Sequence, residues 1–402
     1  MGPVTTLLRF RCIEPVWPAR PVRHFSIPCR YRCRMDAEHP RPSGGPAERI
    51  AARIAASPAP AKGPCPVLVT GGAGYIGSHA VLALLDAGWP VVVIDDLSTG
   101  FDWAVPAAAA FHRGDIADRA LVSRLIAQYG IGAIMHFAGS VVVPESVAKP
   151  LKYYENNTAK SRLLIEAAVD GGVRHFIFSS TAATYGIPDA VPVREDARTE
   201  PINPYGWSKL MTERMLADVA AACPINYCAL RYFNVAGADP AGRSGQSTAG
   251  ATHLIKVAVE AATGRRGHVD VFGTDYGTPD GTGVRDYIHV ADLVAAHLLA
   301  LEALIADPRE SHVLNCGYGR GFSVLEVLDS VERQTGRPIE RRLLPRRPGD
   351  PDALVADNRA IRAVLGWSPL RESLDLIVAD ALAWERELDR RRAAHAPLRA
   401  AG

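Results

Sequence analysis

Tyr205, Lys209 and Thr181 have the residue types and spacing of a proton-transfer site. A tyrosine and a lysine four residues apart lie on one face if their segment is a helix. The Lys209 ammonium then favours the phenolate of Tyr205, which makes the tyrosine a usable base near neutral pH. Any one such residue is more often structural, because a buried tyrosine needs only a partner for its hydroxyl. The trio therefore needs a second signal before it indicates catalysis.

The second signal is a glycine-rich run, GGAGYIGSH, at residues 71–79. Gly72, Gly74 and Gly77 match G-x-G-x-x-G, in which glycines permit a tight turn and a close approach of the backbone to a pyrophosphate. Asp95 lies at the usual distance for an acid that accepts hydrogen bonds from a ribose 2′-hydroxyl, and its charge would repel a 2′-phosphate. These features predict a site for NAD rather than NADP. A glycine turn used only for packing is the alternative.

The elements that must position these residues alternate between strands and helices from residue 66 onward. The segments between the strands have the length and composition of crossover helices, so we expect an α/β fold with a doubly wound parallel sheet of the Rossmann type. Asn203 followed by Pro204 predicts a helix from residue 204 to about 219. Ligands collect at the carboxyl ends of such strands, so one crevice should gather the glycine loop, Asp95, residues 136–139 and residues 179–181. Apolar runs predict strands at residues 67–70, 91–95, 133–138, 175–180 and 225–233.

Three parts are expected along the chain. Residues 63–237 form the NAD-binding Rossmann domain, and residues 238–395 form a smaller, mixed substrate lobe, with the segment around 284–306 returning to the Rossmann domain. Residues 1–62 lack periodicity and are rich in proline, arginine and alanine. That composition fits a disordered arm, an over-extended start of translation with Met35 as the true start, or an arginine-rich targeting peptide.

Composition narrows the class of protein. Hydrophobic residues make up 48% of the chain, which is enough for a large core. The net charge of +2 reflects seven arginines among the first 35 residues and leaves the rest slightly acidic, so it does not indicate a nucleic-acid partner. No apolar run approaches the roughly 20 residues of a membrane span. The seven cysteines lack metal-ligand or disulfide spacing, so we expect no metal site and a cytoplasmic location.

Nine motifs carry a resemblance that covers residues from about 66 to 370 in collinear order. With these motifs the chain resembles the UDP-glucose 4-epimerases, which are extended short-chain dehydrogenase/reductases. The resemblance implies an isomerase that uses NAD, a UDP-hexose substrate and a homodimer. The motifs are GGAGYIGSH, DDLSTG (95–100), HFAG (136–139), YYENN (153–157), FSSTAATYG (178–186), NPYGWSK (203–209), RYFNVAGA (231–238), GTGVRDYIHVADL (281–293) and LGW (365–367).

The resemblance also implies roles for individual residues. Tyr205 would be the active-site base, Lys209 would bind the nicotinamide ribose and lower the tyrosine pKa, and Thr181 would bind the sugar hydroxyl. Asp115 and Ile116 could hold the adenine, although an acid after a strand is more often a helix cap. The implied NAD contacts are Gly71, Gly74, Tyr75, Ile76, Gly77, Asp95, Asp96, Ser98, Thr99, Gly100, Asp115, Ile116, Phe137, Ala138, Gly139, Asn157, Tyr205, Lys209 and Tyr232.

For the substrate, the resemblance implies a cradle around the nucleotide in which the sugar can rotate. Arginine forks suit phosphate oxygens and a carboxylate suits ribose hydroxyls. A solvated basic face is the alternative for the segment RRLLPRR, and an ordinary exposed histidine is the alternative for His253. The implied substrate contacts are Thr181, Asn234, His253, Phe272, Arg285, Arg347 and Asp350.

Two positions depart from the family pattern or leave it open. Val141 stands where many relatives carry a lysine near the cofactor, so NAD retention could be weaker. Leu354 aligns with the position whose size is associated with admitting N-acetylated sugars, and leucine is intermediate between the large and small residues found there. We therefore expect UDP-galactose and UDP-glucose as the main pair.

Other functions compete with this one. A nucleotide-sugar dehydratase needs an acid and a base beside the threonine, and Ala182 and Ala183 cannot transfer protons. A 4-epimerase for a UDP-N-acetylhexosamine, UDP-pentose or UDP-uronate is harder to separate, because pockets discriminate weakly between small sugar changes. A catalytically silent NAD-binding protein is the remaining class, and it would have no need of the base.

Overall fold

The structure, a computed structural model, describes residues 64–347 and 349–395, all of which fall within one compact unit. The predictions for residues 1–62 lie outside the described residues. The strands are β1 (Val67–Thr70), β2 (Val91–Asp95), β3 (Ala110–Arg113), β4 (Ala133–His136), β5 (His175–Thr181), β6 (Asn226–Tyr232), β7 (Asn234–Ala236), β8 (Val269–Phe272), β9 (Val284–His289), β10 (His312–Cys316), β11 (Gly321–Ser323), β12 (Arg341–Leu344) and β13 (Ala353–Leu354).

The helices follow the alternation that the sequence predicts. They are α2 (Tyr75–Asp86), α3 (Arg119–Tyr129), α4 (Val143–Ala148), α5 (Pro150–Tyr153), α6 (Lys160–Asp170), α7 (Pro204–Ala222), α8 (Leu254–Ala262), α9 (Val290–Ala306), α10 (Val324–Thr335), α11 (Arg359–Leu365) and α12 (Leu374–His395), with the π-helical turn η2 (Tyr154–Ala159) and the 3-10 turns η1 (Asp102–Ala104) and η3 (Ala182–Thr184).

The larger region is built on a seven-stranded parallel sheet with the strand order β10-β6-β5-β4-β1-β2-β3. This confirms the doubly wound α/β prediction, since the strand order reverses on either side of β1 and β4. The expected crevice needs a small correction, because residues 179–181 belong to β5 itself and His136 ends β4 rather than following it. Their carboxyl ends still meet at one edge of the sheet.

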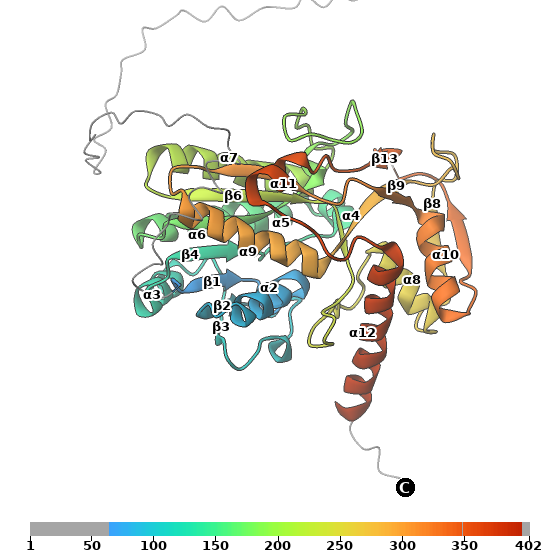
Figure 1. Cartoon of the computed structure of the whole chain (residues 1–402), viewed down its shortest axis with the longest axis horizontal. Coiled ribbons are helices and arrows are strands. Elements are labelled where there is room, and N and C mark those ends of the chain that lie inside the picture. The colour runs from blue at the N-terminus through green and yellow to red at the C-terminus, as the bar shows by residue number, and fades with distance from the viewer. Residues whose placement is uncertain (1–63, 348, 396–402) are drawn as a thin grey trace, which may run out of the picture. The chain divides into compact units, whose positions relative to one another are not determined.

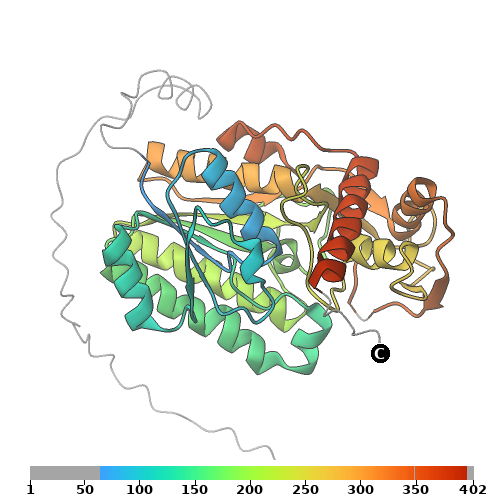
Figure 2. The same ribbon diagram turned by 90° about the horizontal axis from the view of Figure 1, so that it is seen from below.

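Helices cover both faces of this sheet (Figures 1 and 2). Val67 and Val69 of β1 belong to the core shared with α2 and α9, whereas Leu68 belongs to the core shared with α3, α6 and α7. This alternation follows from the pleat, because successive side chains of a strand point to opposite faces. Both faces are buried, so the strands read as continuous apolar runs.

The smaller region contains a four-stranded sheet and a two-stranded sheet. In the first, β9 pairs with β7, β11 and β13, and in the second β8 pairs with β12. Helices α8, α10 and α12 pack together beside these strands (Figure 1). The expected lobe of residues 238–395 includes β10, but β10 pairs with β6 as an edge strand of the large sheet. The predicted boundary at residues 237/238 stays a prediction.

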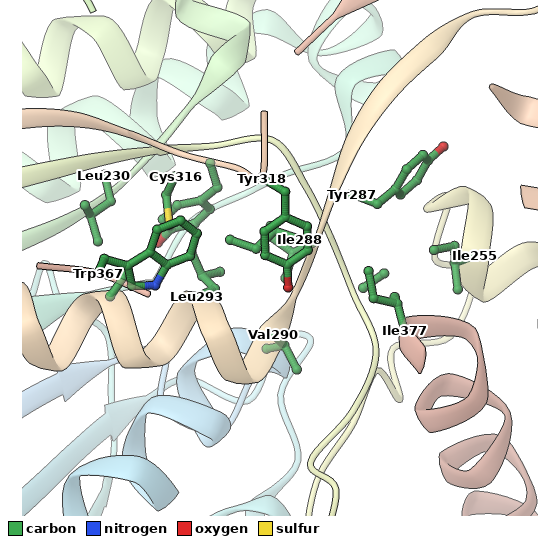
Figure 3. Packing of buried hydrophobic residues seen from close by; sticks show 14 of the residues in the cluster. Leu230, Ile255, Tyr287, Ile288, Val290, Leu293, Cys316, Tyr318, Trp367 and Ile377 are labelled. Atoms are coloured by element: carbon green, nitrogen blue, oxygen red, sulfur yellow. The ribbon is translucent and has the colours of Figure 1, made fainter. Parts of the chain in front are cut away.

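A shared core joins the two regions (Figure 3). Tyr318 and Trp367 stack with their ring centroids 6.3 Å apart, next to Leu293 at the start of α9. The Trp367 indole donates a hydrogen bond to Asp292 O over 3.0 Å, and the Tyr318 hydroxyl donates to Asp292 Oδ2 over 2.6 Å. Within residues 64–347 and 349–395, no helix has the length and apolar character that a membrane span requires.

Candidate active site

The glycine loop connects β1 to α2 with little room for side chains. Gly71 has φ of +70°, and a Cβ there would lie 2.6 Å from the backbone nitrogen of Ala138. A Cβ on Gly77 would lie 2.0 Å from Gly71 O. Gly74 begins α2 without a side-chain cap, so the first helical N–H groups, from Tyr75 onward, face an open end. The turn has the shape of an anion-binding cradle.

Asp95 ends β2 beside this cradle. Its Oδ2 accepts a hydrogen bond from Ala73 N over 3.0 Å, and its Oδ1 accepts one from Leu97 N over 2.8 Å. Burial raises the pKa of Asp95, while those two bonds act in the opposite direction. The loop that follows stays close to the cradle, because a Cβ on Gly100 would lie 2.9 Å from Ala73 backbone atoms. Asp96, Ser98 and Thr99 lie on this same loop.

Asp115, which was predicted to hold the adenine, forms an ion pair that was not predicted from the sequence. Asp115 and Ile116 follow the end of β3 by two and three residues, and the Lys160 ammonium pairs with the Asp115 carboxylate. Burial acts to raise the pKa of Asp115, but the bond from Lys160 leaves that pKa below its ordinary value. Asp115 also accepts a hydrogen bond from Ala117 N over 2.9 Å, but the residue that caps α3 is Asp118, so Asp115 is not the helix cap of our alternative. Ile116 is buried in the core.

The segment after β4 is fixed by Asn157. Its Oδ1 accepts a hydrogen bond from Ser140 N over 2.7 Å, and its Nδ2 donates to Ser140 O over 2.9 Å. Gly139 lies between this amide and Lys209, since a Cβ there would be 3.0 Å from Asn157 Oδ1 and 3.6 Å from Lys209 Nζ. Phe137 N donates to the backbone of Thr70 over 3.0 Å. Residues 137–139, Asn157 and Lys209 are therefore brought together.

Tyr205 and Thr181 meet across α7 and β5. Asn203 caps α7 as predicted, with its side chain accepting a hydrogen bond from Gly206 N, and the helix runs on to Ala222. Burial raises the pKa of the Tyr205 phenol, and a hydrogen bond with Thr181 opposes that shift. Thr181 Oγ1 also accepts from Ala183 N over 3.1 Å, which fixes the side chain at the strand end.

Lys209 is almost completely buried beside this pair. Its Nζ donates to Ser179 O over 2.9 Å and lies 5.0 Å from the centroid of the Phe178 ring. Burial lowers the pKa of Lys209 to about 8. The ammonium is thus held one helical turn beyond Tyr205, near the carboxyl end of β5.

Tyr232 and Phe137 converge on a buried histidine. The Tyr232 hydroxyl is hydrogen-bonded with His297 Nε2 over 3.1 Å, and the Phe137 and His297 ring centroids are 4.9 Å apart. Burial raises the pKa of Tyr232 well above its ordinary value, and burial lowers that of His297 to about 4. Both hydroxyl and imidazole are therefore neutral at physiological pH.

The predicted substrate residues fall into two groups. Asn234 and His253 line a cleft bounded by β7, α8 and α12, and Tyr75 of the cradle lines it too. Arg285 on β9 pairs with Asp350. The Arg347 guanidinium lies 3.8 Å from the centroid of the Phe272 ring, at the end of β8. β7, β9 and β13 are neighbouring strands, with Asn234 opposite Tyr287 and Leu354 opposite Arg285.

Sequence reasoning missed one partner of the central trio and one buried residue on the helix that carries Tyr205 and Lys209. The acceptor for Lys209 is a backbone carbonyl, that of Ser179, and residue type carries no signal for it. The spacing of Glu213 could have identified it, because Glu213 follows Lys209 by four residues and so lies on the same face of the helix as Tyr205. It forms a buried ion pair with Arg231. Val141, where we expected a missing cation, is 48% exposed.

Comparisons with known proteins show the family and the fold. The profile of the NAD dependent epimerase/dehydratase family matches residues 67–317. The chain is 58% identical over 323 residues to a UDP-glucose 4-epimerase of Azospirillum brasilense, across 80% of this chain and 92% of that protein.

Solved structures show the same similarity in three dimensions. The UDP-glucose 4-epimerase of Bifidobacterium longum in complex with NAD+ and UDP has a TM-score of 0.76 and 39% identity, over 80% of this chain and 98% of that chain. The UDP-Glc/GlcNAc 4-epimerase of Campylobacter jejuni has a TM-score of 0.71 and 46% identity, over 80% of this chain and 99% of that chain. These matches cover nearly the full length of each relative.

Proposed function

Because this chain belongs to the NAD-dependent epimerase/dehydratase family, we propose that it catalyses the reversible C4 epimerisation of UDP-galactose and UDP-glucose with NAD as its cofactor. One observation carries the proposal. Tyr205 and Thr181 are hydrogen-bonded at the carboxyl end of β5, next to a buried Lys209 and a glycine cradle.

The cradle fits a dinucleotide. Gly71 and Gly77 leave no room for a Cβ, which is the shape that a closely approaching pyrophosphate requires, and Asp95 is held in place by two backbone N–H groups. When bound there, NAD supplies reversible oxidation at the sugar C4. The other predicted NAD contacts, from the 95–100 loop to Asn157 and Tyr232, are assigned to the same cofactor in this proposal.

The proton transfer falls to Tyr205. Burial raises its pKa, so the phenol needs help to ionise, and Thr181 supplies one hydrogen bond to it. The Lys209 charge would add electrostatic stabilisation of the phenolate. In this proposal Tyr205 removes the proton from the C4 hydroxyl and returns it after the 4-keto sugar has presented its other face. Thr181 holds that hydroxyl in reach.

The UDP group is assigned to the smaller region. Arg285, with Asp350 beside it, and Arg347, stacked on Phe272, offer cations and a ring surface for a diphosphate and a uracil. Asn234 and His253 line the adjoining cleft. A firmly held nucleotide leaves the hexose free to rotate, which the inversion at C4 requires.

A 4-epimerase with wider specificity is the second candidate. The observation that favours it is the 46% identity to the UDP-Glc/GlcNAc 4-epimerase of Campylobacter jejuni. A UDP-pentose or UDP-uronate epimerase remains the further alternative.

A coupled assay tests the function. Purified protein with UDP-galactose should form UDP-glucose, and Tyr205→Phe should lower kcat by about 10²–10⁴-fold, as expected for loss of a general base. Tyr129→Phe is the matched control. Tyr129 lies on α3, away from the trio, and its hydroxyl is hydrogen-bonded with His112 of β3. Repeating the assay with UDP-N-acetylglucosamine and a UDP-pentose ranks the alternatives. Wild-type protein that holds NAD but converts no sugar would instead be a silent NAD-binding protein.

A homodimer is proposed for the assembly. Helices α4, α5 and α7 pack together and carry large exposed apolar side chains, among them Val147 (63% exposed), Leu151 (79%) and Met211 (41%). A second copy of the chain would cover this face. Light scattering after size exclusion should give twice the chain mass for wild type and one chain mass for Leu151→Glu. Leu370→Glu changes a similarly exposed leucine elsewhere and is the control.

The cytoplasm is the proposed location of the protein, which cell fractionation would test.

A further inference from the structure

The last helix, α12, reaches back to the loop that follows β2 (α12 is red in Figure 1). Trp103 of η1 stacks on Trp384 of α12, with ring centroids 6.2 Å apart and an interplanar angle of 29°. Phe101 packs on Trp103 with centroids 5.2 Å apart. The Arg391 guanidinium lies 5.3 Å from the Trp103 ring and 4.8 Å from the Trp384 ring. Three rings and one cation therefore form a single contact.

The α12 side of this contact is firmly fixed. Trp384 is buried, and its indole donates a hydrogen bond to Ser247 Oγ over 3.2 Å. A Cβ on Gly245 would lie 2.3 Å from the Trp384 ring, so the backbone fits closely around the indole. Arg391 Nε donates to Glu387 Oε1 over 3.0 Å. Trp103, at 43% exposed, therefore packs from the solvent side on a buried partner.

The other side of the loop touches the glycine cradle. Phe101 N donates to Ala73 O over 2.9 Å, and Gly100 approaches Ala73 so closely that a Cβ would not fit. A small cleft is lined jointly by the cradle, the loop, residues 244–245 and residues 247–248. The loop is therefore held between the cradle and α12. Its central residues, Ser98 and Thr99, are among those assigned to NAD.

We propose that Trp103, Trp384 and Arg391 form a clasp that keeps residues 97–101 closed on the dinucleotide and so sets how long the chain retains NAD. This rests on the proposed function for the assignment of NAD to the cradle. The clasp residues are positioning residues, since they act through the loop. Opening a loop is a common route for release, and affinity differences appear mostly in dissociation rates.

The test measures release of NAD from the purified full chain. Holoenzyme is diluted rapidly, and free NAD is assayed against time for wild type, Trp103→Ala and Arg391→Ala. We expect NAD to be lost about fivefold faster, or more, from both variants, because each removes a cation–π or stacking contact. Trp103→Phe keeps a ring and should lie nearer to wild type. Arg390→Ala is the matched control, because Arg390 also pairs with Glu387, over 3.1 Å, and should change the rate less than twofold.

Two further readouts separate the clasp from a general loss of structure. Adding saturating NAD should restore kcat of the variants to the wild-type value. The unfolding temperatures of NAD-free Trp103→Ala and Arg391→Ala should fall by no more than the few degrees that the loss of one such contact causes. Release at the wild-type rate from both variants would overturn the clasp. If wild type binds no NAD, the proposed function fails with it. If wild type holds NAD but epimerises no sugar, the release rates still decide on the clasp.

Discussion

Arg231 of β6 and Glu213 of α7 form a bidentate ion pair. Arg231 donates from Nε to Oε1 over 3.0 Å and from Nη2 to Oε2 over 2.7 Å, and both side chains are almost fully buried. Ser180, the residue before Thr181, also donates to the Glu213 carboxylate. Since Glu213 shares α7 with Tyr205, the pair fixes the helix that carries the base relative to the strand that carries Thr181.

Glu213→Gln should destabilise the protein strongly. The amide keeps the shape of the side chain but leaves the Arg231 charge buried without a counter-ion, and breaking a buried pair in this way costs about 3–5 kcal/mol. Urea unfolding of the NAD-free protein measures the change. Glu166→Gln is the control, since Glu166 pairs with Arg119 and Arg162 at the surface, where an ion pair contributes only about 0–1 kcal/mol. Equal effects of the two substitutions would contradict the buried role of Glu213.

The buried ammonium of Lys209 should appear in the pH dependence of stability. Burial lowers its pKa to about 8 in the folded protein, whereas an unfolded lysine titrates near about 10.4. Between these values the unfolded chain binds a proton that the folded chain lacks, so the free energy of unfolding rises with pH. The wild type should therefore gain stability relative to Lys209→Met as pH rises from about 8 to about 10.4.

Denaturant unfolding at a series of pH values measures this gain. Lys149→Met is the matched control for removal of a lysine, because the Lys149 side chain is 66% exposed. The difference between wild type and Lys149→Met should stay flat over the same interval. A flat difference for Lys209→Met as well would show that its ammonium is not penalised by burial.

Gly77→Ala should abolish tight NAD binding. The new Cβ would lie 2.0 Å from Gly71 O, so the cradle or the start of α2 must shift. Isothermal titration of NAD-free protein with NAD is the measurement, and the expected weakening is at least about a hundredfold, since a misplaced cradle loses several phosphate hydrogen bonds. Gly267→Ala is the control, because no heavy atom lies within 4 Å of a Cβ placed there. Unchanged affinity in Gly77→Ala would mean that the loop serves packing alone.

Local signals in the sequence predicted the elements best. β1 and β2 match their expected bounds because short apolar runs end there at glycine, proline or aspartate, and Asn203 caps α7 as expected. Features that depend on tertiary contact were not predicted. The pairing of β10 with β6, the carbonyl of Ser179 that accepts from Lys209, and the stack of Trp103 on Trp384 join distant segments whose meeting no periodicity records.

Substrate range should depend on Leu354. Its strand pairs with β9 opposite Arg285, and its side chain packs on a cluster that contains Ala182 and Phe233, the neighbours of Thr181 and Asn234. Removing or adding bulk there changes the space beside the proposed sugar. Leu354→Ala should raise the ratio of kcat/KM for UDP-N-acetylglucosamine to that for UDP-galactose by about tenfold, and Leu354→Tyr should lower it, since small apolar changes discriminate by about 10–200-fold.

A ratio measured within one variant cancels any loss of folded enzyme, so a stability cost of either substitution does not affect the comparison. Leu343→Ala is the control, because Leu343 lies on β12 and is 62% exposed. If both Leu354 substitutions move the ratio in the same direction, the side chain does not limit the space for the N-acetyl group. If neither moves it, specificity must be set by the other strands around the sugar.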